Sequence, residues 1–167
     1  MRLRVVLFDL GDTLIRQQID AESPLDRLSL TALPGVEEAL SQCSAVYRLG
    51  LISNTTQSTG PAVARALDKL HLGSFFEVII TSVDVGYKKP AKRIFEAALF
   101  ALRVTAPETL MVGNNLIEDI GGAKALDMRA ALFDPSGTLQ SEVPDFIFHS
   151  MQELAAQIAR LDASLKQ

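Results

Sequence analysis

Apolar runs and helical stripes alternate along this chain. Short apolar runs predict six strands, the last weaker than the rest, at residues 5–8, 45–52, 75–81, 110–113, 129–133 and 146–148. Apolar residues at helical spacing predict helices that start near residues 36, 61, 90, 116 and 151. Strands that alternate with helices of this length are typical of βαβ units. The pattern therefore predicts an α/β fold, with helices on both faces of a doubly wound, mainly parallel sheet.

Length, charge and cysteine content narrow the class of protein. A chain of 167 residues favours one domain that spans residues 1–167. The net charge of −4 argues against a nucleic-acid-binding protein, whose binding face would be basic. Cys43 is the one cysteine, so an internal disulfide is excluded and a reducing compartment is favoured. No apolar stretch approaches the roughly 18–20 residues that cross a bilayer. We therefore expect a cytoplasmic protein with no nucleic-acid or membrane partner.

Polar side chains follow four of the predicted strands, at the point where each strand ends. Asp9 follows the first strand and Ser53 the second. Lys89 lies in the loop beyond the third strand, and Asn114 and Asp119 follow the fourth. In a doubly wound sheet these loops converge on one edge. A carboxylate, a hydroxyl, an ammonium and a second acidic loop together indicate a phosphoryl-transfer site. The first carboxylate attacks phosphorus, and lysine and a metal ion neutralise the phosphate oxygens.

Four segments then resemble the ordered motifs of the haloacid dehalogenase (HAD) superfamily. They are residues 8–14 (FDLGDTL), 53–55 (SNT), 86–90 (GYKKP) and 112–119 (VGNNLIED). The resemblance covers nearly the whole chain. It implies a Rossmann-like core and, in most members, a Mg²⁺-dependent phosphatase that works through an aspartyl-phosphate.

The resemblance also implies a role for each matching residue. Asp9 would be the nucleophile, and Lys89 would neutralise both the nucleophile and the phosphate. Ser53 and Asn54 would bind the phosphate together with Lys89. The implied ligands of Mg²⁺ share oxygen donors; they are Asp9, the backbone carbonyl of Gly11, Asn114 and Asp119.

Two positions depart from the family pattern. Gly11 stands where a second Asp usually protonates the leaving oxygen, and such acids contribute about 10²–10⁴-fold. Asp12 lies one residue later, where an extended chain points it to the other face, so it replaces the acid only if the turn is irregular. Asn114 stands where an Asp usually binds the metal, which lowers the expected metal affinity. Alkyl esters should react slowly, whereas acyl and aryl phosphates need no proton to leave.

The residues leave two interpretations of function open. One is a phosphatase that is slow or restricted to good leaving groups. The alternative is a catalytically impaired HAD-like module that binds phosphate or a protein partner. A receiver domain is disfavoured, since it takes its phosphoryl group after the third strand, where Thr81 and Ser82 stand. Dehalogenase chemistry is also disfavoured, because no apolar halide pocket follows the first strand.

The spacing of the motifs leaves no room for a substantial cap domain. Residues 14–33 are too few for a helical cap, and residues 56–86 are filled by one helix and one strand. An open site suits a large phosphorylated substrate, or a neighbouring subunit that covers it, so a homo-oligomer is compatible with the sequence. Residues 15–32 are interpreted as a small flap.

Overall fold

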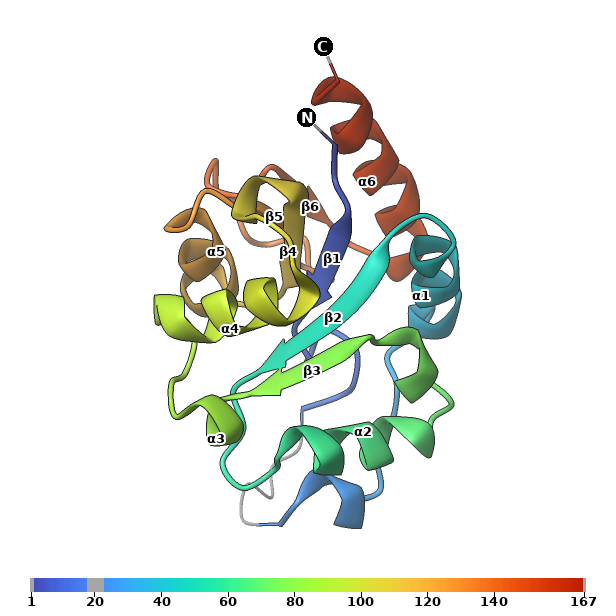
Figure 1. The fold of residues 1–167 in the computed structure, drawn as a ribbon. Coiled ribbons are helices and arrows are strands. Elements are labelled where there is room, and N and C mark those ends of the chain that lie inside the picture. The colour runs from blue at the N-terminus through green and yellow to red at the C-terminus, as the bar shows by residue number, and fades with distance from the viewer. Residues whose placement is uncertain (1, 18–22, 167) are drawn as a thin grey trace.

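Six parallel strands form one sheet in the computed structural model, which describes residues 2–17 and 23–166 (Figure 1). The strand order is β3-β2-β1-β4-β5-β6. Their bounds are β1 Val5–Phe8, β2 Arg48–Ser53, β3 Val78–Thr81, β4 Thr109–Gly113, β5 Arg129–Phe133 and β6 Phe146–Phe148. The chain crosses from one side of β1 to the other between β3 and β4, so the switch point of the sheet lies beside β1. The predicted α/β, doubly wound fold is confirmed.

Helices cover both faces of the sheet. Helices α1 (Val36–Ser44), α2 (Gly60–Asp68) and α6 (Met151–Ser164) pack into one apolar cluster, and α4 (Lys92–Leu102) and α5 (Gly122–Lys124) into the other. The short elements are α3 (Ser82–Val85), the 3-10 turns η1 (Leu25–Arg27), η2 (Gly73–Phe75) and η3 (Ala106–Glu108), and the π-helical turn η4 (Leu116–Gly121). Within the described part of the chain, no helix has the length and apolarity that a membrane crossing requires.

Strand β1 lies at the centre of the sheet because all its side chains are apolar. Its four residues are fully buried, and they alternate between the two apolar clusters. A strand that is covered on both faces reads as a continuous apolar run rather than as an alternating pattern. The pairing of β1 with β4 extends one step further, since Asp9 N–H donates to the Val112 carbonyl at 2.9 Å. This bond fixes Asp9 at the carboxyl end of the sheet.

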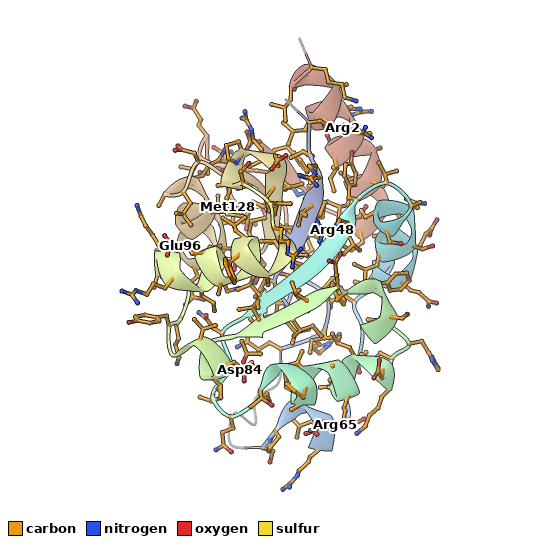
Figure 2. All side chains as sticks on the ribbon, viewed as in Figure 1. Arg2, Arg48, Arg65, Asp84, Glu96 and Met128 are labelled. Atoms are coloured by element: carbon orange, nitrogen blue, oxygen red, sulfur yellow. The ribbon has the colours of Figure 1, made fainter. Side chains whose placement is uncertain are left out.

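Two local predictions were wrong, and one short helix was not predicted. The helix expected from Pro90 begins at Lys92, because residues 88–91 form a turn closed by Ala91 N–H on the Lys88 carbonyl. The single helix expected over residues 116–126 is a π-helical turn followed by α5. Helix α3 was not expected; Figure 2 labels Asp84 on this helix. Thr81 caps α3 by accepting from Asp84 N–H, and the Asp84 carboxylate accepts from Gly60 N–H.

The described residues contain no cap domain. Between β1 and α1, η1 lies against α2, where Leu25 N–H donates to Ser58 Oγ at 2.9 Å and Asp26 pairs with Arg65 at 2.8 Å. Between β2 and α4 lie only α2, η2, β3 and α3. The prediction of no substantial cap is confirmed for this part of the chain. The flap prediction includes residues 18–22, which lie outside the described residues.

Candidate active site

Asp9 and Lys89 form a buried ion pair at the carboxyl end of the sheet. Lys89 Nζ donates to Asp9 Oδ1 at 2.6 Å, to Asp119 Oδ1 at 2.6 Å and to the Ile52 carbonyl at 3.1 Å. These three bonds use all three donors of an ammonium group. The Lys89 and Asp119 side chains are each only 1% exposed, whereas that of Asp9 is 12% exposed. The lysine therefore lies beneath Asp9, and Asp9 faces the surface.

Burial and ion pairing act in opposite directions on the pKa values of Lys89 and Asp119. Burial by itself lowers the pKa of Lys89, but attraction to Asp9 and Asp119 and the hydrogen bonds to both raise it overall, so the amine stays protonated. Burial and the negative charge of Asp9 raise the pKa of Asp119 to about 6, while Lys89 opposes that rise. Two carboxylates and one ammonium leave this cluster with one net negative charge.

Asp119 reaches Lys89 because β4 ends in a glycine. A Cβ on Gly113 would lie 2.3 Å from Asp119 Oδ2, so only glycine leaves room for this carboxylate. Asp119 Oδ2 accepts from Asn115 N–H at 2.9 Å, and Asn115 itself caps the start of η4 through Oδ1. Both oxygens of Asp119 are therefore already hydrogen-bonded. In this structure Asp119 therefore serves as a hydrogen-bond partner of Lys89 and of the Asn115 backbone.

The second oxygen of Asp9 faces neutral groups. Thr13 is fully buried, and its hydroxyl donates to Asp9 Oδ2 at 3.0 Å. The Asn114 side-chain amide lies 3.1 Å from Asp9 Oδ2 and 3.2 Å from the Gly11 carbonyl oxygen. The orientation that satisfies both polar atoms of this amide turns its nitrogen toward them, and the nitrogen then also donates to Thr13 Oγ1 at 3.3 Å.

An open pocket of about 290 Å³ lies over Asp9. The predicted site residues that line it are Asp9, Gly11, Ser53, Asn54, Asn114 and Asp119, with Lys89 below its floor. Ser53 ends β2 and is buried. The Asn54 side chain makes two hydrogen bonds to the backbone of Lys89. Its Oδ1 accepts from Lys89 N–H at 2.7 Å, and its Nδ2 donates to the Lys89 carbonyl at 3.1 Å. Asn54 thus positions Lys89 in this structure.

Among the residues that the structure describes, no carboxylate takes the place of the missing general acid. A Cβ on Gly11 would meet only Gln17, whose Oε1 would lie 3.7 Å away. Asp12 adopts a left-handed conformation with φ of 56°, and its Oδ1 accepts from Gln17 N–H at 2.8 Å. The turn is irregular, yet the carboxylate of Asp12 is exposed, and Asp12 does not line the pocket.

Sequence reasoning did not assign Thr13, Gln17 or Glu118 to the site. Thr13 lies within a quoted motif, but nothing in the spacing identified Asp9 as its partner. Glu118 lines the pocket and accepts from Asn54 Nδ2 at 3.3 Å. Gln17 lies in a stretch with no periodicity, so no signal indicated that it would approach Gly11.

Comparison with known proteins places this geometry in a family. The haloacid dehalogenase-like hydrolase family matches residues 9–133, which carry every residue described above. The chain belongs to this family. Similar proteins include the ribulose-1,5-bisphosphate 5-phosphatase of Halopiger xanaduensis, with 33% identity over 75% of this chain and 51% of that protein. Another is the glyceraldehyde 3-phosphate phosphatase of Pyrococcus abyssi, with 38% identity over 62% of this chain and 43% of that protein. The chain thus spans about half the length of these relatives.

Solved structures agree on the HAD fold. An uncharacterized protein from Listeria monocytogenes serotype 4b superposes with a TM-score of 0.85 at 25% identity, covering 96% of this chain and 99% of that one. A HAD phosphatase from Thermococcus onnurineus gives a TM-score of 0.78 at 20% identity, covering 93% and 98%. The predicted membership of the HAD superfamily is confirmed.

HAD membership implies a divalent cation, and the oxygens around Asn114 fit one by chemistry and spacing. With its amide oxygen turned inward, Asn114 places that atom 3.1 Å from Asp9 Oδ2 and 3.2 Å from the Gly11 carbonyl. Adjacent oxygens around an octahedral Mg²⁺ lie about 3 Å apart, because each is about 2.1 Å from the ion. These three oxygens include one carboxylate, that of Asp9, and Mg²⁺ sites in proteins often contain one or two.

Proposed function

We propose that this HAD-family chain is a phosphatase that transfers a phosphoryl group to Asp9. An oxygen of Asp9 attacks phosphorus, and the bond from phosphorus to the leaving oxygen breaks with its electron pair on that oxygen. Water then attacks phosphorus, inorganic phosphate leaves, and Asp9 is restored. The observation that carries this proposal is the position of Asp9 at the floor of an open pocket, with Lys89 Nζ 2.6 Å behind it.

The surrounding residues have defined tasks in this reaction. Lys89 pairs with Asp9 and opposes the negative charge that spreads over the phosphate oxygens. Ser53 lines the pocket at the end of β2 and offers a hydroxyl to the phosphate. Mg²⁺, when bound, would neutralise further phosphate charge, and Asp9, the Gly11 carbonyl and Asn114 would hold it.

We propose that the preferred substrates carry leaving groups that depart without a proton. Neither Gly11 nor Gln17 can supply a proton to the leaving oxygen. Acyl phosphates, aryl phosphates and phosphoanhydrides tolerate this loss better than alkyl esters do. Among the relatives, the pyrophosphatase PpaX of Bacillus mycoides, at 29% identity, is named for an anhydride substrate.

The cytoplasm remains the proposed compartment, since Cys43 is buried as a free thiol.

Phosphate release tests the proposal. Acetyl phosphate, p-nitrophenyl phosphate, pyrophosphate and glycerol phosphate are compared with Mg²⁺ titrated to high concentration. The first three should release phosphate faster than glycerol phosphate does. The variant Asp9→Asn should release none, whereas Asp127→Asn should match the wild type, because Asp127 is exposed and lies outside the pocket.

Two results would contradict the proposal. Turnover that survives Asp9→Asn would remove Asp9 from the mechanism. Phosphate binding without release from any of the four compounds would favour the alternative, a HAD module that binds phosphate without turnover.

A further inference from the structure

The Asn114 side chain lies where three oxygen-bearing groups of the site converge. Its amide is 3.1 Å from Asp9 Oδ2, 3.2 Å from the Gly11 carbonyl and 3.3 Å from Thr13 Oγ1. Two of these oxygens are the ones that would bind a cation. An amide nitrogen that faces them is a donor that faces acceptors, so the contacts are attractive in the absence of any ion.

We propose that the Asn114 amide nitrogen is a built-in substitute for the divalent cation of the site. Its N–H groups bind the oxygens of Asp9 and Gly11 that a cation otherwise binds. A cation enters only when the amide turns over and presents its oxygen instead. The inference deepens the proposed function because it concerns the same residues, but it requires no turnover.

The charges of the site support this inference. Lys89 offsets one of the two carboxylates at Asp9 and Asp119. Thr13 donates to the other side of Asp9, and the Asn114 amide does so as well when its nitrogen is turned inward. A carboxylate at position 114 would add a third negative charge against one ammonium, and a cation would then be needed to hold the group together. Across the described residues, every buried side-chain nitrogen or oxygen has a hydrogen-bond partner. The site is therefore satisfied by protein groups alone.

The need to turn the Asn114 amide over weakens cation binding. Turning the amide over breaks its N–H bonds to Asp9 and Gly11 before the new ligand bond forms. The ligand offered in return is neutral, whereas an aspartate would bring a full negative charge. Since the charge of the ligands tunes affinity in oxygen-rich cation sites, Mg²⁺ should bind this chain about tenfold more weakly, or worse, than it binds Asn114→Asp.

Metal binding and unfolding, both measured without substrate, test the inference. Wild type, Asn114→Asp and Asn114→Ala are unfolded by heat in EDTA and in MgCl₂, and Mg²⁺ affinity is measured by calorimetry. The wild type should unfold at nearly the same temperature in both buffers. Asn114→Asp should unfold at least about 2–4 °C lower in EDTA, should recover in MgCl₂, and should bind Mg²⁺ about tenfold more tightly or better.

Two further variants keep the test decisive. Asn114→Ala removes the amide without adding charge, so it should lose about 2–4 °C in EDTA and gain nothing from MgCl₂. Asn115→Asp is the matched control: it adds the same charge one residue away and keeps a residue that caps η4. It should show no tenfold gain in Mg²⁺ affinity.

The inference is overturned if the wild type binds Mg²⁺ as tightly as Asn114→Asp, or if Asn114→Ala is as stable in EDTA as the wild type. Should Asn114→Asp fail to fold in EDTA, the wild-type affinity and Asn114→Ala still decide the question. Phosphatase assays enter none of these measurements, so the role of Asn114 can be decided even for a chain without turnover.

Discussion

The two carboxylate oxygens of Asp9 lie in contrasting surroundings. Oδ1 faces a buried ammonium, Lys89, which a second carboxylate holds in place. Oδ2 faces the Thr13 hydroxyl and the Asn114 amide, neither of which carries a charge. On the Oδ1 side, Lys89 and Asp119 match the HAD motifs. On the Oδ2 side, Gly11 and Asn114 stand where those motifs usually have carboxylates. The charged contacts of Asp9 thus lie on one side of its carboxylate and the neutral contacts on the other.

Removing Lys89 should have the largest effect, because it breaks the charged side of this comparison. Lys89→Met leaves Asp9 and Asp119 buried without a counter-charge, and breaking such a pair costs about 3–5 kcal/mol in the free energy of unfolding. Denaturant titration measures the loss, and phosphate release should vanish. Lys124→Met is the control; its partner Asp145 keeps Arg129 at 3.0 Å, so at most about 1 kcal/mol should be lost. Equal losses in the two variants would contradict the importance of the buried cluster.

Introducing a carboxylic acid at position 11 should have the next largest effect, because it changes the neutral side of Asp9. Gly11→Asp places its Cβ in ordinary contact with Gln17 Oε1 at 3.7 Å, so a Cβ at this position meets no clash. Release of phosphate from glycerol phosphate should rise by about 10²–10⁴-fold, and release from acetyl phosphate should change far less. Gly11→Asn has the same shape and no proton to give. An equal gain with Gly11→Asn would show that the effect is not acid catalysis.

Thr13 provides a smaller test of the neutral side. Thr13→Val keeps the shape of a fully buried side chain but removes the donor to Asp9 Oδ2. A hydrogen bond to a charged group contributes about 1.5–3 kcal/mol, so the free energy of unfolding should fall by about that amount. Thr13→Ser retains the hydroxyl and should recover most of the loss in a urea titration. No loss with valine would mean that Asp9 Oδ2 does not depend on this bond.

Asp12 should matter least. Its carboxylate is exposed and bonds Gln17 N–H, and asparagine tolerates the same left-handed backbone and accepts the same bond. Asp12→Asn should change the free energy of unfolding by less than about 0.5 kcal/mol and leave phosphate release unchanged. A large fall in the turnover of alkyl esters alone would instead identify Asp12 as a substitute acid.

The sequence predicted the sheet well because its signals are local. The six apolar runs are the six strands, and the polar residues that follow them do gather at one edge. Contacts across the fold were harder to predict. The HAD resemblance implies that Asn54 binds phosphate, and that stays a prediction; no signal in the sequence indicated that its side chain bonds the backbone of Lys89, 35 residues away. The π-helical form of η4 and the direction of Asp12 likewise depend on neighbours that no spacing in the sequence reveals.

The Asn54 side chain joins three loops: its own after β2, that of Lys89 through two backbone bonds, and that of Glu118 through Nδ2. A substrate that contacted Glu118 would therefore contact a hydrogen-bond partner of the Asn54 amide, and the same amide positions Lys89 beneath Asp9. A single planar amide thus connects a carboxylate that lines the pocket to the backbone of the lysine under its floor.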